Sequence, residues 1–386
     1  MFSQHRGTAA AVAALTLLSS QAWAAQRPPG MKPLATSPKA GLWVDSDKAE
    51  LQVQQSPELD ASPELNAYVR GVACKVAPDY CGELRLYILD RPYLNAAMAP
   101  NGYTEVWSGL LLRVEDEAEL AFVLGHEVSH YGENHSLAAH EALKNRANAG
   151  MILAAGISAI GVAGAAGASS TQGAQQILSS TGDLARLAYL GSIATLFSFN
   201  REQESQADAL GFRRAVAAGY RPAAAAAADL WGAVIADNAA SDFDKVRKMD
   251  AQLSIFDDHP ASAARQTALK TEAASVTASG DSGAERLRTA MRPRLVVWLR
   301  SELRRRDYGA TLHLLDRLAK SGEDLGVINY YRGEAFRARR GDGDLARAAQ
   351  AYAAACDAYQ AYLTKASGAE DAWMVQDSLQ ALGKAN

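Results

Sequence analysis

The sequence is poor in cysteine, in aromatic residues and in surplus charge of either sign. It contains only 3 cysteines and 7% aromatic residues in 386 positions, and its formal net charge is −4. Three cysteines are too few for a small scaffold built on disulfides, and the near-balance of charge gives no indication of electrostatic binding to nucleic acid or acidic lipid. Its content of 48% hydrophobic residues is typical of a globular protein, and its length predicts two domains.

A long internal stretch lacks charge altogether, since no charged residue lies between Arg146 and Asp183. Residues 149–170 are long enough to cross a membrane, but they are mostly Ala and Gly, which gain little free energy on transfer into lipid. We therefore favour a close-packed internal helix. A helix or hairpin in peripheral membrane contact is the main alternative, and a transmembrane span is the weakest one.

The N-terminus is typical of a secretory leader. Residues 1–24 begin with one histidine and one arginine, continue with an uncharged run rich in Ala and Leu, and end in the small-x-small sequence AWA. We predict a signal peptide cleaved after Ala24 and hence a periplasmic protein, either free or membrane-associated. Residues 25–60, which begin with a Pro-rich stretch, are predicted to form an arm on the main domain.

Export makes the few cysteines informative. Cys74 and Cys81 are close in sequence, with Pro78 between them. In an oxidising compartment we expect a disulfide between them. Two free thiols are the alternative, and a zinc pair is disfavoured because no second pair of ligands lies nearby. Cys356 falls in an apolar helical pattern that is typical of a buried structural residue.

Hydrophobic periodicity predicts a mainly α-helical fold with a small β-sheet. Residues 84–90 alternate as a strand does. Residues 95–99 and 103–107 flank Asn101-Gly102, a dipeptide typical of hairpin turns. Residues 116–147 are predicted to form one long helix, whose first turn is acidic as the helix dipole favours.

The chain divides into two parts by this pattern. Residues 61–276 contain the predicted sheet. Residues 277–290 are rich in Gly and Ser in their first half and predict a linker. Residues 291–386 are helical in pattern throughout. Two helix–turn–helix patterns in the last part favour a tetratricopeptide-like module that recruits a protein partner or client. An unrelated helical bundle is the alternative.

Residues 126–130 have the pattern H-E-x-x-H. On a helix, His126 and His130 lie one turn apart on the same face, so both imidazoles can bind one metal ion. Glu127 lies beside them, where its carboxylate can accept a proton from water. Because the surrounding stretch is apolar, burying these three residues without a function would be costly. They are therefore the candidate metal ligands and the candidate general base.

The third ligand is expected further along the chain. His135 would lie on another face of the predicted long helix, and His140 would lie two to three turns away, so we assign both to the helix surface or to a supporting position. Glu204 is the better ligand, since two histidines and one carboxylate leave a position of a zinc ion open, as in catalytic sites. Asp208, one turn further, can accept the remaining ring N–H of a ligand histidine.

Several motifs in order carry a family resemblance. The segments are NAAMAPNG, SGLLLRVEDEAELAFVLGHEVSH, NREQESQAD and HPASAAR. Together they resemble the marks of the zinc metallopeptidases of the gluzincin type that include the CAAX prenyl proteases and the HtpX-type proteases. The multiple membrane spans of that family are absent here. The chain is thus most similar to the soluble periplasmic branch, which includes the β-barrel assembly-enhancing protease.

The resemblance covers about residues 60–270 and implies one Zn²⁺ per chain, with His126, His130 and Glu204 as ligands and Glu127 as general base. Substrate would then add as a β-strand along residues 95–99. These are Asn95, Ala96, Ala97, Met98 and Ala99.

The H-P element of the resemblance contributes His259 and Arg265. His259 would stabilise an oxyanion, gate the metal or cap its helix, and we assign both residues to the transition state or to gating. The chain departs from the family at Asp257 and Asp258, where small hydroxyl residues are usual.

These features predict an exported zinc metalloendopeptidase that hydrolyses unfolded or misassembled envelope proteins. One alternative is a chaperone or scaffold that acts through the C-terminal helices, with a gated or vestigial metal site. A membrane-bound protease is a further alternative, and it rests on residues 149–170 alone.

Overall fold

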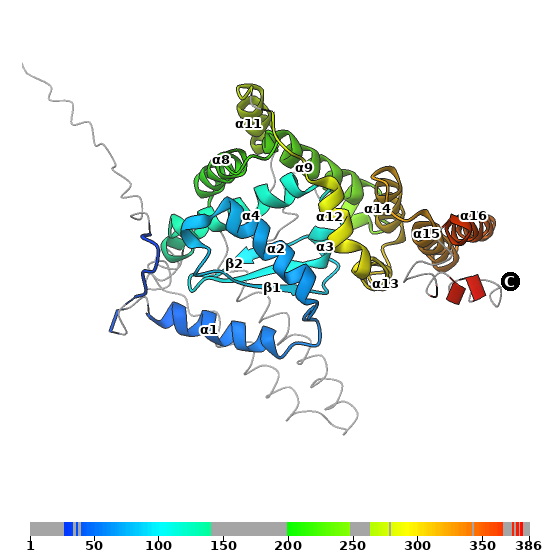
Figure 1. The fold of residues 1–386 in the computed structure, drawn as a ribbon, viewed down its shortest axis with the longest axis horizontal. Coiled ribbons are helices and arrows are strands. Elements are labelled where there is room, and N and C mark those ends of the chain that lie inside the picture. The colour runs from blue at the N-terminus through cyan, green and yellow to red at the C-terminus, as the bar shows by residue number, and fades with distance from the viewer. Residues whose placement is uncertain are drawn as a thin grey trace, which may run out of the picture.

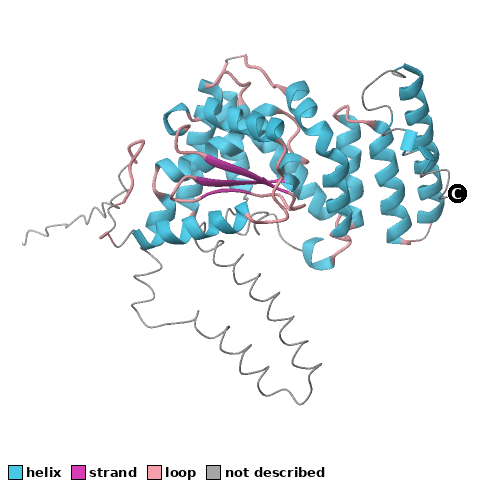
Figure 2. Ribbon diagram, turned by 60° about the horizontal axis from the view of Figure 1, so that its bottom comes forward, coloured by secondary structure: helices cyan, strands magenta, loops and turns pink. Residues whose placement is uncertain are grey.

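A three-stranded sheet lies between helices, and further helices extend the molecule at one end (Figures 1 and 2). This computed structural model describes residues 27–33, 36–37, 40–139, 199–247, 263–277, 279–341, 343–365 and isolated positions beyond them. The predicted leader, residues 149–170, His140 and His259 lie outside the described residues.

The described elements follow the chain in a simple order. The strands are β1 (Arg85–Leu89), β2 (Ala96–Met98) and β3 (Tyr103–Trp107). The helices are α1 (Ala40–Gln54), α2 (Pro63–Val76), η1 (Pro78–Tyr80), α3 (Ser108–Leu111), α4 (Glu117–Gly132), α8 (Arg201–Ala217), α9 (Ala223–Ala239), α10 (Asp244–Arg247), α11 (Ala263–Ala274), α12 (Ala284–Met291), η2 (Arg292–Arg294), α13 (Leu295–Arg304), α14 (Tyr308–Lys320), α15 (Leu325–Arg339) and α16 (Asp344–Lys365).

The sheet confirms the predicted strands and their turn. Its order is β1-β3-β2, with β1 parallel and β2 antiparallel to β3. Between β2 and β3, Gly102 has φ +88°, and a Cβ there would lie 2.4 Å from the carbonyl oxygen of Glu83. Glycine is required at this position because it tolerates both the positive φ and the close approach.

Helix α4 lies in the core and is buried at every position from Glu117 to Gly132. At its start, the side chain of Asp116 accepts a hydrogen bond from the backbone N–H of Glu119. The helix is shorter than the one predicted over residues 116–147. Asn134 adopts a left-handed conformation with φ 54°, which ends the helix because a continued α-helix needs negative φ throughout.

Helices α4 and α8 cross at two glycines. A Cβ on Gly211 would lie 2.8 Å from the backbone nitrogen of His126, and one on Gly125 would lie 3.1 Å from the carbonyl oxygen of Gly211. The backbones thus approach as closely as residues without side chains allow. Glu204 and Asp208 share the buried face of α8 with Gly211, so the crossing places both carboxylates against α4.

The predicted linker over residues 277–290 is wrong in its second half. Helix α12 occupies residues 284–291, and its buried Leu287 and Met291 join the core formed with α2 and α4. Leu287 and Met291 lie one turn apart and give this short helix an apolar face that packs inward. Arg286, also on α12, donates hydrogen bonds to Glu117 at the start of α4.

The C-terminal helices share this core. One continuous apolar cluster extends from α2 and α4 to Trp298 of α13, Leu314 of α14 and Tyr331 of α15. Between the two parts, the buried Arg113 pairs with Asp237 of α9 at 3.1 Å and with Glu302 of α13 at 3.0 Å. Helices α13 and α14 are therefore integrated with the preceding part of the chain.

Two helix–turn–helix pairs, α13–α14 and α15–α16, occur where the sequence patterns predicted them, and α14, α15 and α16 lie side by side (Figure 1). Their assignment to the tetratricopeptide class stays a prediction. Within the described residues, every helix is too short or too polar to span a membrane.

The N-terminal arm packs on the sheet and on the end of α4. Helix α1 covers the sheet face opposite α4 (Figure 2), where Ala49 and Val53 cluster with Leu89 and Tyr103. The backbone N–H of Arg27 donates to the carbonyl oxygen of Gly132 at 2.7 Å. The arm predicted over residues 25–60 therefore contacts the last residue of α4.

We expect Gly211→Ala to lower the free energy of unfolding by about 1–3 kcal/mol, because the new methyl group forces α4 and α8 apart. Gly71→Ala is the matched control, since a Cβ at this position of α2 has no neighbour within 4 Å. The control should be stabilised by roughly 0.5–1 kcal/mol. Urea denaturation measures both, and equal stability of Gly211→Ala and wild type would contradict the close crossing.

Candidate metal centre

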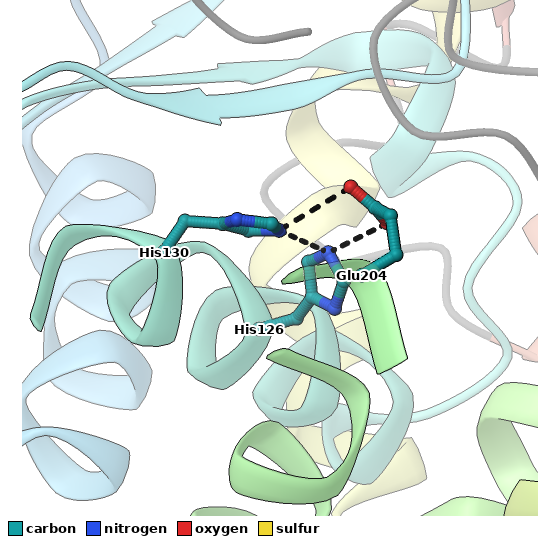
Figure 3. Close-up of side chains that lie close together, drawn as sticks. All are labelled: His126, His130 and Glu204. Carbon is teal, nitrogen blue, oxygen red and sulfur yellow. Dashed lines mark hydrogen bonds and ion pairs between the residues drawn. The ribbon is translucent and has the colours of Figure 1, made fainter. Parts of the chain in front are cut away.

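Three buried side chains from two helices meet at one point. His126 and His130 extend from α4 toward Glu204 at the first turn of α8 (Figure 3). One potential ligand atom from each residue lies within 4.8 Å of the others. The Nε2 atoms of the two histidines are 3.0 Å apart, and carboxylate oxygens of Glu204 lie 3.6 Å and 3.5 Å from them.

This donor set fits zinc. Two imidazole nitrogens and one carboxylate are ligands that Zn²⁺ accepts, and three protein ligands leave a further coordination position open. All three side chains are buried, with Glu204 and His130 fully excluded from solvent. Grouping them in the interior is costly for polar side chains alone, and a bound cation offsets that cost.

Helix capping places Glu204 at the site. Asn200 caps α8 by accepting hydrogen bonds from the backbone N–H groups of Glu202 and Gln203, and the Gln203 side chain accepts one from the backbone N–H of Asn200. This capping box fixes the first turn of α8, which carries Glu204.

Asp208 lies beside the ring of His126. Its Oδ1 lies 3.1 Å from Nδ1 of His126, on the side of the ring away from Glu204. Burial alone would raise the pKa of Asp208, but the hydrogen bonds and charge of Arg265, with a contribution from His126, lower it to about 2. Asp208 is therefore an ionised carboxylate that can accept the ring N–H of His126.

Arg265 binds both carboxylates of α8. Its guanidinium lies 2.7 Å from Glu204 Oε2 and donates hydrogen bonds of 2.6 Å and 2.7 Å to Asp208. We predicted a role at the transition state or in gating from the sequence. The observed contacts are instead with a candidate ligand and with its neighbour on α8.

Glu127 is buried beside the two histidines and is 3% exposed. Burial acts to lower the pKa of Arg265, but Asp208, Glu204 and, least of the three, Glu127 raise it above its usual value. Glu127 is thus a buried carboxylate that follows the candidate ligand His126 on α4, the position of the general base in the H-E-x-x-H pattern.

Two contacts of His130 were not predicted from the sequence. The ring of Phe199 stacks on the His130 ring with 3.8 Å between centroids, and Nδ1 of His135 lies 2.9 Å from Nδ1 of His130. Phe199 lies before the start of α8, outside any helical periodicity, so the sequence pattern could not predict its contact with His130. His135 approaches His130 because the chain turns at Asn134. Asparagine tolerates the left-handed conformation that ends a helix, so this residue was the sequence signal for the turn.

The predicted substrate strand is at the edge of the described sheet. Residues 96–98 form β2, which pairs with β3 alone among the described strands. Its side chains Ala96, Ala97 and Met98 are all buried. The predicted disulfide between Cys74 and Cys81 is present between α2 and the residue after η1.

This site defines a class of protein. An H-E-x-x-H helix whose two histidines face a glutamate from a second helix is the centre of a zinc metallopeptidase of the gluzincin type. The family model for Peptidase family M48 matches residues 60–273, which is more than half of the chain. The chain belongs to this family, whose members are zinc metalloproteases.

Individual relatives agree with the family. Over 174 residues the chain is 31% identical to Metalloprotease LoiP of Escherichia coli, a match that covers 45% of this chain and 56% of LoiP. Over 45 residues it is 44% identical to the mitochondrial Metalloendopeptidase OMA1 of Bos taurus and 42% identical to that of Homo sapiens. These short matches cover 12% of this chain and 9% of each relative. The chain thus matches about half of LoiP and under a tenth of OMA1.

We expect Arg265→Met to lower the free energy of unfolding by about 3–5 kcal/mol, because it leaves two buried carboxylates without their cation. Arg213→Met is the matched control, since Arg213 also joins α8 to α11 through its ion pair with Glu272, but is 59% exposed. The control should lose less than about 1 kcal/mol. Thermal or urea unfolding of the metal-free proteins measures both, and equal losses would exclude this role of Arg265.

Proposed function

We propose that this protein is a zinc metalloendopeptidase that cleaves unfolded or misassembled polypeptides in the periplasm. The observation that carries the proposal is the meeting of His126, His130 and Glu204 around one point, with Glu127 buried beside them. The family and the similarity to a metalloprotease support the reaction class.

The residues of the chain have distinct tasks in this proposal. Bound zinc would supply a Lewis acid that polarises the scissile carbonyl and acidifies a water molecule. His126, His130 and Glu204 hold the ion, and Asp208 and Arg265 keep His126 and Glu204 in place. Glu127 accepts the proton of the attacking water at its carboxylate and returns it to the leaving amine.

Strand β2 is the proposed position for substrate. It contacts α4 and stands at the edge of the described sheet. A polypeptide added along this edge is bound through its main chain, which requires an extended conformation and little sequence specificity. Unfolded chains meet that requirement more readily than folded ones.

The compartment and partners follow from separate features. A leader-like sequence over residues 1–24 and the disulfide between Cys74 and Cys81 support export to an oxidising compartment. The end helices α15 and α16 are the proposed surface for a protein partner or client. For residues 149–170 we propose a close-packed internal helix, with peripheral membrane contact as the alternative.

Two glutamate variants test this proposal. Glu127→Gln should retain zinc but digest unfolded casein at least about 100-fold more slowly than wild type, because only the proton acceptor is lost. Glu204→Gln should lose both zinc and activity. Metal analysis and a casein assay on the purified full-length proteins measure these effects.

Glu202→Gln is the control, because this exposed glutamate lies on the same turn of α8 outside the centre. It should retain both zinc and activity. Wild-type rates for zinc-loaded Glu127→Gln would show that another group acts as the base.

A further inference from the structure

The two ring nitrogens of His130 have different surroundings. Nε2 faces the candidate metal centre, 3.0 Å from Nε2 of His126 and 3.5 Å from Glu204. Nδ1 faces the opposite way and lies 2.9 Å from Nδ1 of His135. The metal ligand His130 therefore makes its outward contact with a second imidazole.

The contacts continue beyond His135 on both helices. Nε2 of His135 lies 3.1 Å from Oε1 of Gln206 on α8. The amide nitrogen of Gln206 then donates to the carboxylate of Glu133, the residue that follows α4, at 2.9 Å. His135, Gln206 and Glu133 form this series of contacts, the His135 relay.

Each hydrogen bond of the His135 relay can be assigned a donor and an acceptor, with donation running from His130 toward Glu133. An imidazole nitrogen that binds a metal carries no proton, so a neutral His130 with Nε2 toward the ion has its proton on Nδ1. That N–H donates to Nδ1 of His135, which requires the His135 proton to be on Nε2. Nε2–H donates to the oxygen of Gln206, whose NH₂ group donates to Glu133, so every contact joins one donor to one acceptor.

The turn at the end of α4 brings His135 next to His130. In a continuous helix, His135 would be rotated by about 140° from His130 and would point away from it. The left-handed Asn134 redirects the chain immediately after the helix, and His135 returns to the side of His130. His135 is 4% exposed, so its ring is enclosed where it contacts the ligand.

We propose that the His135 relay holds His130 in the tautomer whose Nε2 can bind the metal, which makes His135 a positioning residue of the metal centre. The proposal rests on the proposed zinc site. The two histidine ligands are then supported differently. His126 is held by the ionised Asp208, whereas His130 is held by a neutral imidazole, with Phe199 stacked on its ring.

Variants at His135 test this role through zinc affinity. His135→Phe keeps a planar ring but removes the acceptor, and it should weaken zinc binding by about 10–100-fold. His135→Asn keeps an acceptor near the position of Nδ1 and should lose less than about tenfold. Competition with a chelating dye measures the affinity of each full-length protein. Ser205→Ala, at an exposed position of α8 beside Gln206, is the control and should bind zinc as wild type does.

A spectroscopic measurement separates positioning from general loss of structure. In the zinc-loaded wild type, nitrogen NMR of the imidazoles should show His130 protonated at Nδ1, with slow exchange of that proton. The same proton should exchange faster in His135→Phe, because its acceptor is gone. Should that variant fail to fold, Gln206→Leu carries the test, since it removes the acceptor of His135 and should weaken zinc binding about threefold or more.

The outcomes separate this proposal from the proposed function. Failure of the wild type to bind zinc, or binding unaffected by Glu204→Gln, would refute the metal site itself. If the wild type binds zinc, two results would overturn the relay and leave the site intact. One is that His135→Phe keeps both the wild-type zinc affinity and the wild-type proton exchange at His130. The other is that Gln206→Leu keeps the wild-type zinc affinity.

Discussion

The close crossing of α4 and α8 is the constraint on which the metal centre depends. Glu204 lies more than 70 positions after the two histidines in sequence, and it meets them where Gly125 and Gly211 let the helix backbones approach closely. Arg265 then forms ion pairs with Glu204 and Asp208, the two carboxylates of α8 that lie next to His126. Core packing and the polar centre thus share one interface, so a change in helix spacing also changes the distances between ligands.

Much of the centre could be predicted from the sequence, because its residues follow helical periodicity. His126 and His130, like Glu204 and Asp208, are four positions apart and therefore share a helix face. Residues 95–107 carried an equally local signal, since Asn101-Gly102 specified the turn between β2 and β3.

The remainder could not be predicted because it depends on single backbone conformations or on tertiary contacts. One left-handed residue, Asn134, ends α4 and reverses the position of His135 relative to His130. The Gly- and Ser-containing turn before α12 resembles a linker in composition, but Leu287 and Arg286 attach it to the core and to Glu117. Arg265 had no local pattern that could identify its partners.

The attachment of Arg27 has a consequence for local stability. Arg27 is 4% exposed, and its guanidinium lies over the rings of Trp43 and Tyr131. Its backbone N–H donates a hydrogen bond to the carbonyl oxygen of Gly132. The turn at residues 133–134, which leads into His135, begins there. Local opening of a structure starts where few contacts hold a segment. Release of the arm would therefore expose the end of α4 to hydrogen exchange before the buried crossing with α8 opens.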